Sequence, residues 1–96
     1  MSTVIETAVA ALKERLEGVD ISNVVKFVIE GEGAVMVKPD GVEAGDEEAD
    51  VTLTADAEAF QEILSGALNP TSAFMSGRLS VDGDMGAAMA LGSALS

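Results

Sequence analysis

Two residue types that enzymes use most often, cysteine and histidine, are missing from this 96-residue chain. Without cysteine there are no disulfides, no thiol nucleophile and no thiolate metal site. Without histidine there is no Ser-His-Asp triad and no usual zinc or iron ligand. Tyrosine and tryptophan are also absent, which leaves only carboxylates, hydroxyls and a few basic groups for catalysis. The composition therefore argues against an enzyme, and we expect neither a metal nor a cofactor.

Positive charge is scarce. The chain has 17 acidic residues against five basic ones, which gives a formal net charge of −12. The basic residues are scattered, at Lys13, Arg15, Lys26, Lys38 and Arg78. Nucleic-acid phosphates and anionic membrane surfaces would be repelled by this balance. We therefore expect no nucleic-acid partner, and we interpret the charge as a source of solubility.

Long apolar runs are missing as well. No stretch approaches the roughly 20 residues that a membrane-spanning helix needs, so we expect no stable membrane insertion. The first twelve residues lack a signal-peptide pattern, and Ala94-Leu95-Ser96 is not a peroxisomal tripeptide. The length suits one domain over residues 1–96. We expect a single domain in the cytoplasm.

Hydrophobic residues nevertheless make up 48% of the chain, including three phenylalanines and five methionines. This share argues against disorder and predicts a packed interior. Methionine is flexible, so it suits either a cavity that accepts variable apolar shapes or the gaps of an ordinary core. Composition alone leaves both interpretations open.

Hydrophobic periodicity predicts four helices and five strands. Helices are expected at 3–17, 57–65, 70–76 and 85–94, and strands at 24–30, 34–38, 42–44, 50–54 and 79–81. Their order is typical of an α+β domain with a largely antiparallel sheet. The last strand follows two helices and is a candidate for parallel pairing. Alternation and helical spacing direct four large side chains to the interior: Phe27, Ile29, Phe60 and Leu64.

Polar clusters offer weaker candidates. The four acids at 46–48 and 50 include ligands that a hard cation would accept, but their spacing is not that of an EF-hand, and a solvated loop explains them. Asp82 and Asp84 are a possible carboxylate pair, although Asp84 is better explained as a helix cap. Asn69 to Ser72 begins a helix, where capping competes with anion binding as the interpretation.

The segment from Asn69 to Leu91 closely resembles the C-terminal signature of the sterol carrier protein domain family, also called non-specific lipid-transfer proteins. Residues 49–54, followed by a helix, are also similar to the family. The resemblance covers about three quarters of the chain. The matching positions are Asn69, Pro70, Ala73, Phe74, Gly77, Leu79, Gly83, Met85, Gly86, Ala88, Met89 and Leu91.

The resemblance implies a mixed, mostly antiparallel five-stranded sheet, helices over one of its faces, and a hydrophobic tunnel between them. The tunnel of the family holds sterols, fatty acids, acyl-CoA or other lipids. Residue-by-residue transfer places five side chains at the tunnel: Phe74, Met75, Leu79, Met85 and Met89. The interior-facing Phe27, Ile29, Phe60 and Leu64 are secondary candidates for the same site.

One departure narrows this expectation. Family members often carry basic residues around the strand before the final helix, whereas this chain has only Arg78 there. Electrostatic docking on anionic membranes and binding of acyl-CoA phosphates are therefore not expected. The predicted function is to bind, and to carry, a lipid in an internal apolar cavity. The alternative is an accessory module of the same fold whose cavity has closed and whose acidic face meets a protein partner.

Overall fold

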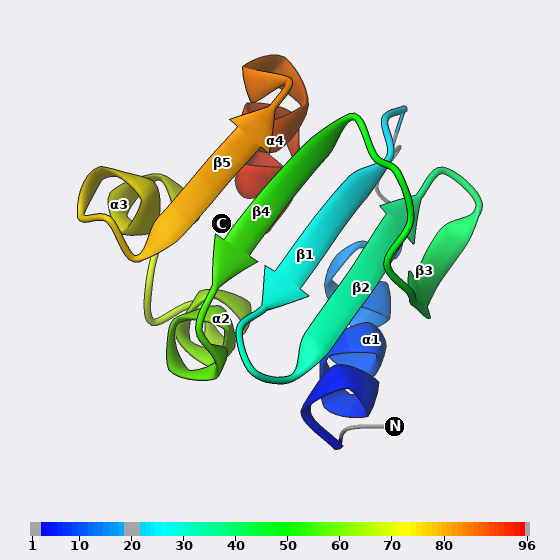
Figure 1. Ribbon diagram of the computed structural model, residues 1–96, viewed down its shortest axis with the longest axis horizontal. Coiled ribbons are helices and arrows are strands. Elements are labelled where there is room, and N and C mark those ends of the chain that lie inside the picture. Colours follow the sequence, from blue (N-terminus) through cyan, green and yellow to red (C-terminus); the bar gives the residue numbers. More distant parts are fainter. Residues whose placement is uncertain (1–2, 19–21, 96) are drawn as a thin grey trace.

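The computed structural model describes residues 3–18 and 22–95, and its centre is a five-stranded sheet (Figure 1). The strands are β1 (Val25–Ile29), β2 (Gly33–Lys38), β3 (Gly41–Ala44), β4 (Val51–Ala55) and β5 (Leu79–Gly83). They lie in the order β3-β2-β1-β4-β5, and β1 and β4 are the parallel neighbours. The other three pairs are antiparallel. The α+β fold class with a mixed, mostly antiparallel sheet is confirmed.

The parallel pairing falls on a different strand from the expected one. The candidate was the last strand, but β5 runs antiparallel to β4. The chain leaves β3, crosses the sheet and enters β4 in the direction of β1. After α2 (Ala57–Ser65) and α3 (Pro70–Met75) the chain returns as β5 along the free edge of β4, in the opposite direction. The crossover that allows the parallel pairing is therefore the segment between β3 and β4, residues 45–50, which is called the acidic loop below.

Four helices are present in the described residues, and they cover one face of the sheet (Figure 1). They are α1 (Thr3–Arg15), α2 (Ala57–Ser65), α3 (Pro70–Met75) and α4 (Met85–Leu95). The predicted caps define two of them. The Asp56 carboxylate accepts a hydrogen bond from the Ala59 amide at 2.7 Å and begins α2, and Gly66 ends it with a φ of 85°. Asn69 begins α3 by accepting from the Thr71 amide at 2.8 Å.

The core lies between the sheet and α1 and α2. Strand alternation turns Phe27 and Ile29 toward the helices, and both are almost fully buried. Leu12 from α1 and Phe60 from α2 close over them. The rings of Phe27 and Phe60 meet edge to face, with centroids 5.3 Å apart, which is a favourable aromatic geometry. The same buried core continues along β4 and β5 through Val51, Leu53 and Leu79.

The turn from β5 into α4 requires glycine. Gly83 has a φ of 118°, which side chains with a Cβ rarely adopt. A Cβ at this position would lie 2.5 Å from the carbonyl oxygen of Asp50. The next amide, of Asp84, donates to that same carbonyl at 3.0 Å. This contact anchors the start of α4 to the start of β4, and thereby sets the position of the helix over the sheet.

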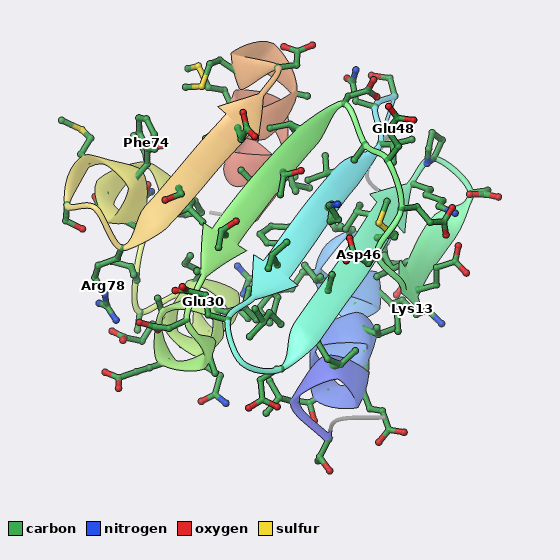
Figure 2. The ribbon with its side chains drawn as sticks, viewed as in Figure 1. Lys13, Glu30, Asp46, Glu48, Phe74 and Arg78 are labelled. Carbon is green, nitrogen blue, oxygen red and sulfur yellow. The ribbon has the colours of Figure 1, made fainter. Side chains whose placement is uncertain are left out.

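The acidic loop crosses the sheet face that the helices leave free. Figure 2 shows Asp46 over this face, and its carboxylate pairs with Lys26 Nζ at 2.8 Å. Lys38 pairs with Glu43 at 2.8 Å and with Glu47 at 3.3 Å. The hydrogen bond to Glu43 raises the pKa of Lys38, and the same bond lowers the pKa of Glu43. The lysines of the sheet thus hold the loop in place.

Met36 lies beneath this loop. It belongs to the face of β2 that points away from the helices, yet its side chain is fully buried. The Glu47 amide donates to its sulfur at 3.5 Å, and Gly45 packs against its side chain. Among the described residues no group of three or more acidic side chains is arranged to hold a metal ion. The acidic loop covers Met36 on this face of the sheet, and its carboxylates at Asp46 and Glu47 pair with Lys26 and Lys38.

Candidate functional site

An apolar cavity of about 280 Å³ opens between α3, α4 and the sheet. Its walls come from β1, β4, β5 and from α2, α3 and α4. Thr71 carries the one polar side chain among the lining residues, and none of them is charged. They are Phe27, Leu53, Ile63, Pro70, Thr71, Phe74, Met75, Leu79, Val81, Met85, Ala88, Met89 and Gly92.

The floor of the cavity follows directly from strand register. Phe27 of β1 lies beside Leu53 of β4, and Leu53 lies beside Val81 of β5. Neighbours in register point to the same face of a sheet, so one row of side chains runs across three strands beneath the cavity. Leu79 is two residues before Val81 and faces the same way. The floor is therefore built from apolar side chains of the sheet, of which Phe27, Leu53 and Leu79 are buried and Val81 is partly buried.

The mouth of the cavity is formed by large apolar side chains that remain in contact with solvent. The exposed fraction is 42% for Phe74, 80% for Met75, 46% for Met85 and 69% for Met89. In the described part of the chain, these four are the large hydrophobic residues that are exposed, and all four line this cavity. Figure 2 shows Phe74 rising from α3 beside β5. An exposed apolar cluster of this kind is typical of a ligand-binding groove or an interaction surface.

Small side chains on α4 keep the cavity open. Ala88 and Gly92 lie one helical turn apart and both face the cavity. A Cβ at Gly92 would lie 3.7 Å from the Cβ of Pro70, so the two helices approach each other closely at this end. Ala87 and Leu91 lie on the neighbouring side of α4 and are buried in the core. The helix therefore attaches by one side and leaves space beside the other.

The structure brings six of the nine predicted site residues to this cavity: Phe27, Phe74, Met75, Leu79, Met85 and Met89. Three lie outside its lining. Ile29 is buried at the end of β1, while Phe60 and Leu64 border a separate cleft of about 180 Å³ between α1 and α2. The apolar side chains of α2 therefore face two places. Ile63 lines the cavity, whereas Phe60 and Leu64 face α1.

Several lining residues were not among the predicted site residues: Leu53, Ile63, Pro70, Thr71, Val81, Ala88 and Gly92. For two of these the sequence carries a usable signal. Val81 shares strand alternation with Leu79, and Leu53 alternates with Val51. The small residues Ala88 and Gly92 carry no such signal, because a small side chain in a helix suits close packing as well as an open space.

The polar candidates at this end of the molecule are already engaged in structure. Asp84 Oδ1 accepts from the Gly86 amide at 2.8 Å and caps the start of α4. The Thr71 and Ser72 amides at the start of α3 donate to Asn69 Oδ1, so the cap takes the donors that an anion would use. These contacts favour capping over catalysis at the Asp82–Asp84 pair and over anion binding at α3.

An ion pair fixes the segment between α3 and β5. Arg78 Nη2 lies 2.7 Å from Glu62 Oε2 of α2, and this hydrogen bond raises the pKa of the guanidinium. The Arg78 amide also donates to the Ala73 carbonyl at 2.8 Å. In Figure 2 the Arg78 side chain points away from Phe74. Arg78 therefore holds the α3 wall in position and presents no charge to the cavity.

Apart from the Thr71 hydroxyl the lining side chains are apolar, so the cavity suits an apolar molecule. Within residues 3–18 and 22–95, no helix is long and apolar enough to cross a membrane.

Comparison with known proteins agrees with this geometry. The family model described as the SCP-2 sterol transfer family matches residues 3–96. Hydroxysteroid dehydrogenase-like protein 2 of Danio rerio is 43% identical over a 76-residue alignment, and the match covers 71% of this chain and 18% of that protein. Sterol carrier protein 2 of Homo sapiens is 35% identical over 79 residues, which are 82% of this chain and 12% of that protein. The chain thus spans less than a fifth of the length of these two relatives.

A solved structure shares the fold over the whole chain. The solution structure of sterol carrier protein 2 from Aedes aegypti, in complex with the C16 fatty acid palmitate, superposes with a TM-score of 0.78 at 25% identity. The match covers 100% of this chain and 97% of that one. With the family model matching nearly every residue, the chain belongs to the SCP-2 sterol transfer family.

Proposed function

We propose that this protein binds a lipid with its apolar part in the cavity between α3, α4 and the sheet, and carries it in that form. The observation that supports this most directly is the pairing of an uncharged cavity with a mouth of exposed apolar side chains. A cavity that served only as a packing defect would be closed over by its neighbours. Membership of a sterol transfer family supports the same function.

Burial of a hydrocarbon chain would supply the affinity. Each methylene removed from water contributes about 0.8 kcal/mol, so ten buried methylenes contribute roughly 8 kcal/mol before the costs of association. The cavity volume of about 280 Å³ lies near the lower end of the range of about 300–1,000 Å³ for ligand pockets. We therefore expect part of a long lipid to lie along the mouth, in contact with Met75 and Met89.

The chemistry of the lining also limits the ligand. Fatty acids and sterols are both candidates, since a relative was solved with palmitate and the family is named for sterol transfer. Acyl-CoA is disfavoured, because no cation lines the cavity to receive its phosphates. Among simple lipids selectivity should be broad, because an apolar pocket distinguishes one methylene by only about 1–3 kcal/mol.

Two substitutions on the same helix test the proposal. Ala88→Leu adds three carbons inside the cavity, whereas Ala90→Leu adds the same atoms at an exposed position on α4. Titration of a fluorescent fatty acid should show about tenfold weaker binding for Ala88→Leu and unchanged binding for Ala90→Leu. Equal affinities for the two variants, or no uptake of fatty acid and sterol by the unmodified protein, would reject lipid binding in this cavity.

The remaining features of the function are proposals of the same kind. Residues 1–96 would act as one lipid-binding domain without catalytic activity of its own. A location in the cytoplasm and the absence of a nucleic-acid partner stay predictions from the sequence. The accessory-module alternative is not favoured, because it required a closed cavity and this one is open. A protein partner at the acidic surface stays a prediction.

A further inference from the structure

The oxidation chemistry of this protein is concentrated in one residue type. Cysteine and methionine are the side chains that peroxides oxidise most readily, and this chain has no cysteine. It also has no histidine, tyrosine or tryptophan. The five methionines are therefore the groups on which a mild oxidant acts.

Three of the five methionines lie together at the mouth of the cavity. Met75 of α3 is 80% exposed, and in α4 Met85 is 46% exposed and Met89 is 69% exposed. All three line the cavity. Met36, in contrast, is fully buried under the acidic loop on the opposite face of the sheet. Among the described residues, the accessible thioethers therefore lie at the proposed lipid site.

We infer that Met75, Met85 and Met89 form an oxidation site, and that their conversion to sulfoxides by a peroxide weakens lipid binding. This inference rests on the proposed function of the cavity. In each step hydrogen peroxide transfers one oxygen atom to a thioether sulfur and leaves as water. The sulfur loses two electrons, and the peroxide gains them. No other reactant is needed.

The effect follows from the polarity of the product. A sulfoxide carries a strong hydrogen-bond acceptor on a side chain that was apolar. Covering that acceptor with a hydrocarbon chain would remove its water without a new hydrogen bond, which is unfavourable. A sulfoxide at Met85 should weaken lipid binding the most, because Met85 is the least exposed of the three methionines. A bound lipid would cover the part of its side chain that is still exposed. The oxidised mouth should therefore resist closure over a lipid.

The fold itself should survive this modification. The core side of α4 is formed by Ala87 and Leu91, and α3 is held to the core by Ala73 and Pro70. None of these residues is oxidisable. The three sulfurs lie outside this packing, so sulfoxides can form in water without the insertion of a polar group into the core. The consequence of oxidation should appear in ligand affinity, with little change in stability.

The test compares the unmodified protein with the variant Met75→Leu/Met85→Leu/Met89→Leu, which keeps the mouth apolar but cannot be oxidised there. Both are treated with dilute hydrogen peroxide, mapped by peptide mass spectrometry and titrated with a fluorescent fatty acid. In the unmodified protein, oxidation at Met75 and Met89 should be on the order of tenfold faster than at Met36. Affinity should fall by about tenfold, and methionine sulfoxide reductase should restore it. In the triple variant, peroxide treatment should leave the affinity at that variant's own untreated value, whatever that value is.

Three results would overturn the inference. Unchanged affinity of the oxidised protein would show that the sulfoxides do not impede the lipid. An equal loss in the triple variant would place the cause at another residue, and circular dichroism would show whether that cause is unfolding. Failure of the untreated protein and of the untreated triple variant to bind lipid would reject the proposed function, and this inference with it. Binding before treatment separates the two claims, because it is measured without oxidation.

Discussion

The helix layer consists of two parts that cover the same face of the same sheet in different ways. Over β1 and β2, α1 and α2 pack closely against the sheet and form the closed part, in which Leu12 and Phe60 are buried. Over β4 and β5, α3 and α4 leave a cavity whose mouth exposes Phe74 and three methionines. Figure 1 shows both pairs of helices behind a continuous sheet. The two parts differ in their side chains while sharing one scaffold.

The difference suggests a division of roles. The closed part has large branched and aromatic side chains that interlock, which is the arrangement that stabilises a small domain. The open part has small residues on α4 and flexible methionines at its rim, and the sequences of α3 and α4 contain no charged residue. We expect substitutions in the closed part to change stability and substitutions in the open part to change ligand affinity.

The largest effect on stability is expected at Phe60 in the closed part. Phe60→Ala removes a fully buried ring that contacts Phe27 edge to face, so the free energy of unfolding should fall by about 3–5 kcal/mol. Phe74→Ala, the matched change at the open mouth, should cost less than about 1 kcal/mol because the ring is already half exposed. Urea denaturation measures both. Similar losses for the two variants would contradict the division between the parts.

A second effect is expected at the turn that places α4. Gly83→Ala forces a Cβ against the Asp50 carbonyl at a φ of 118°, and should lower stability by about 2–3 kcal/mol. Gly92→Ala is the control, since its Cβ would make only an ordinary contact with Pro70. A helical alanine should raise stability by up to about 1 kcal/mol there. Thermal unfolding of the two variants should therefore shift in opposite directions, and a shift in the same direction would contradict this assignment.

A smaller effect is expected at the cap of α3. Asn69→Ala removes the acceptor for the Thr71 and Ser72 amides, and should cost about 1 kcal/mol. Because α3 forms one wall of the cavity, fatty-acid affinity should fall as well. Asn69→Asp keeps an acceptor and serves as the control. An Asn69→Ala protein with undiminished affinity would show that α3 is not needed as a wall.

The smallest effect concerns the ion pair between Lys38 of β2 and Glu43 of β3, on the other face of the sheet. The hydrogen bond from Lys38 lowers the pKa of Glu43 below its ordinary value of 4.5. A lowered folded-state pKa gives stability that is present above 4.5 and is lost as the pH falls through the folded value. The thermal midpoint of Glu43→Gln should therefore lie slightly below that of the unmodified protein at about pH 7, and the two should converge at about pH 3. A difference that persists in acid would contradict the pairing.

Most of the fold could be predicted from the sequence, because its signals are local. Caps such as Asp56 and Asn69 and alternation in β1 and β4 mark where elements begin and which face they bury. The direction of β4 next to β1 could not be predicted, because pairing depends on how the chain crosses the sheet. The burial of Met36 could not be predicted either, because the acidic loop that covers it is distant from Met36 in the sequence.

The site could be predicted in part. Phe74, Met85 and Met89 were identified through the family resemblance, and the structure places them at the cavity. Periodicity could not separate Phe60 from Ile63, because both lie on one helical stripe and only the packing of α1 decides which neighbour each one meets. Their role in ligand binding stays a prediction.

The central claim is that a lipid occupies the cavity beneath Met85 and Met89. It can be tested directly by recording the methionine methyl signals in NMR while a spin-labelled fatty acid is added. The account predicts strong broadening of the Met75, Met85 and Met89 signals and much weaker broadening at Met36, which lies across the sheet. Broadening at Met36 equal to that at the mouth, or none at the mouth, would contradict it.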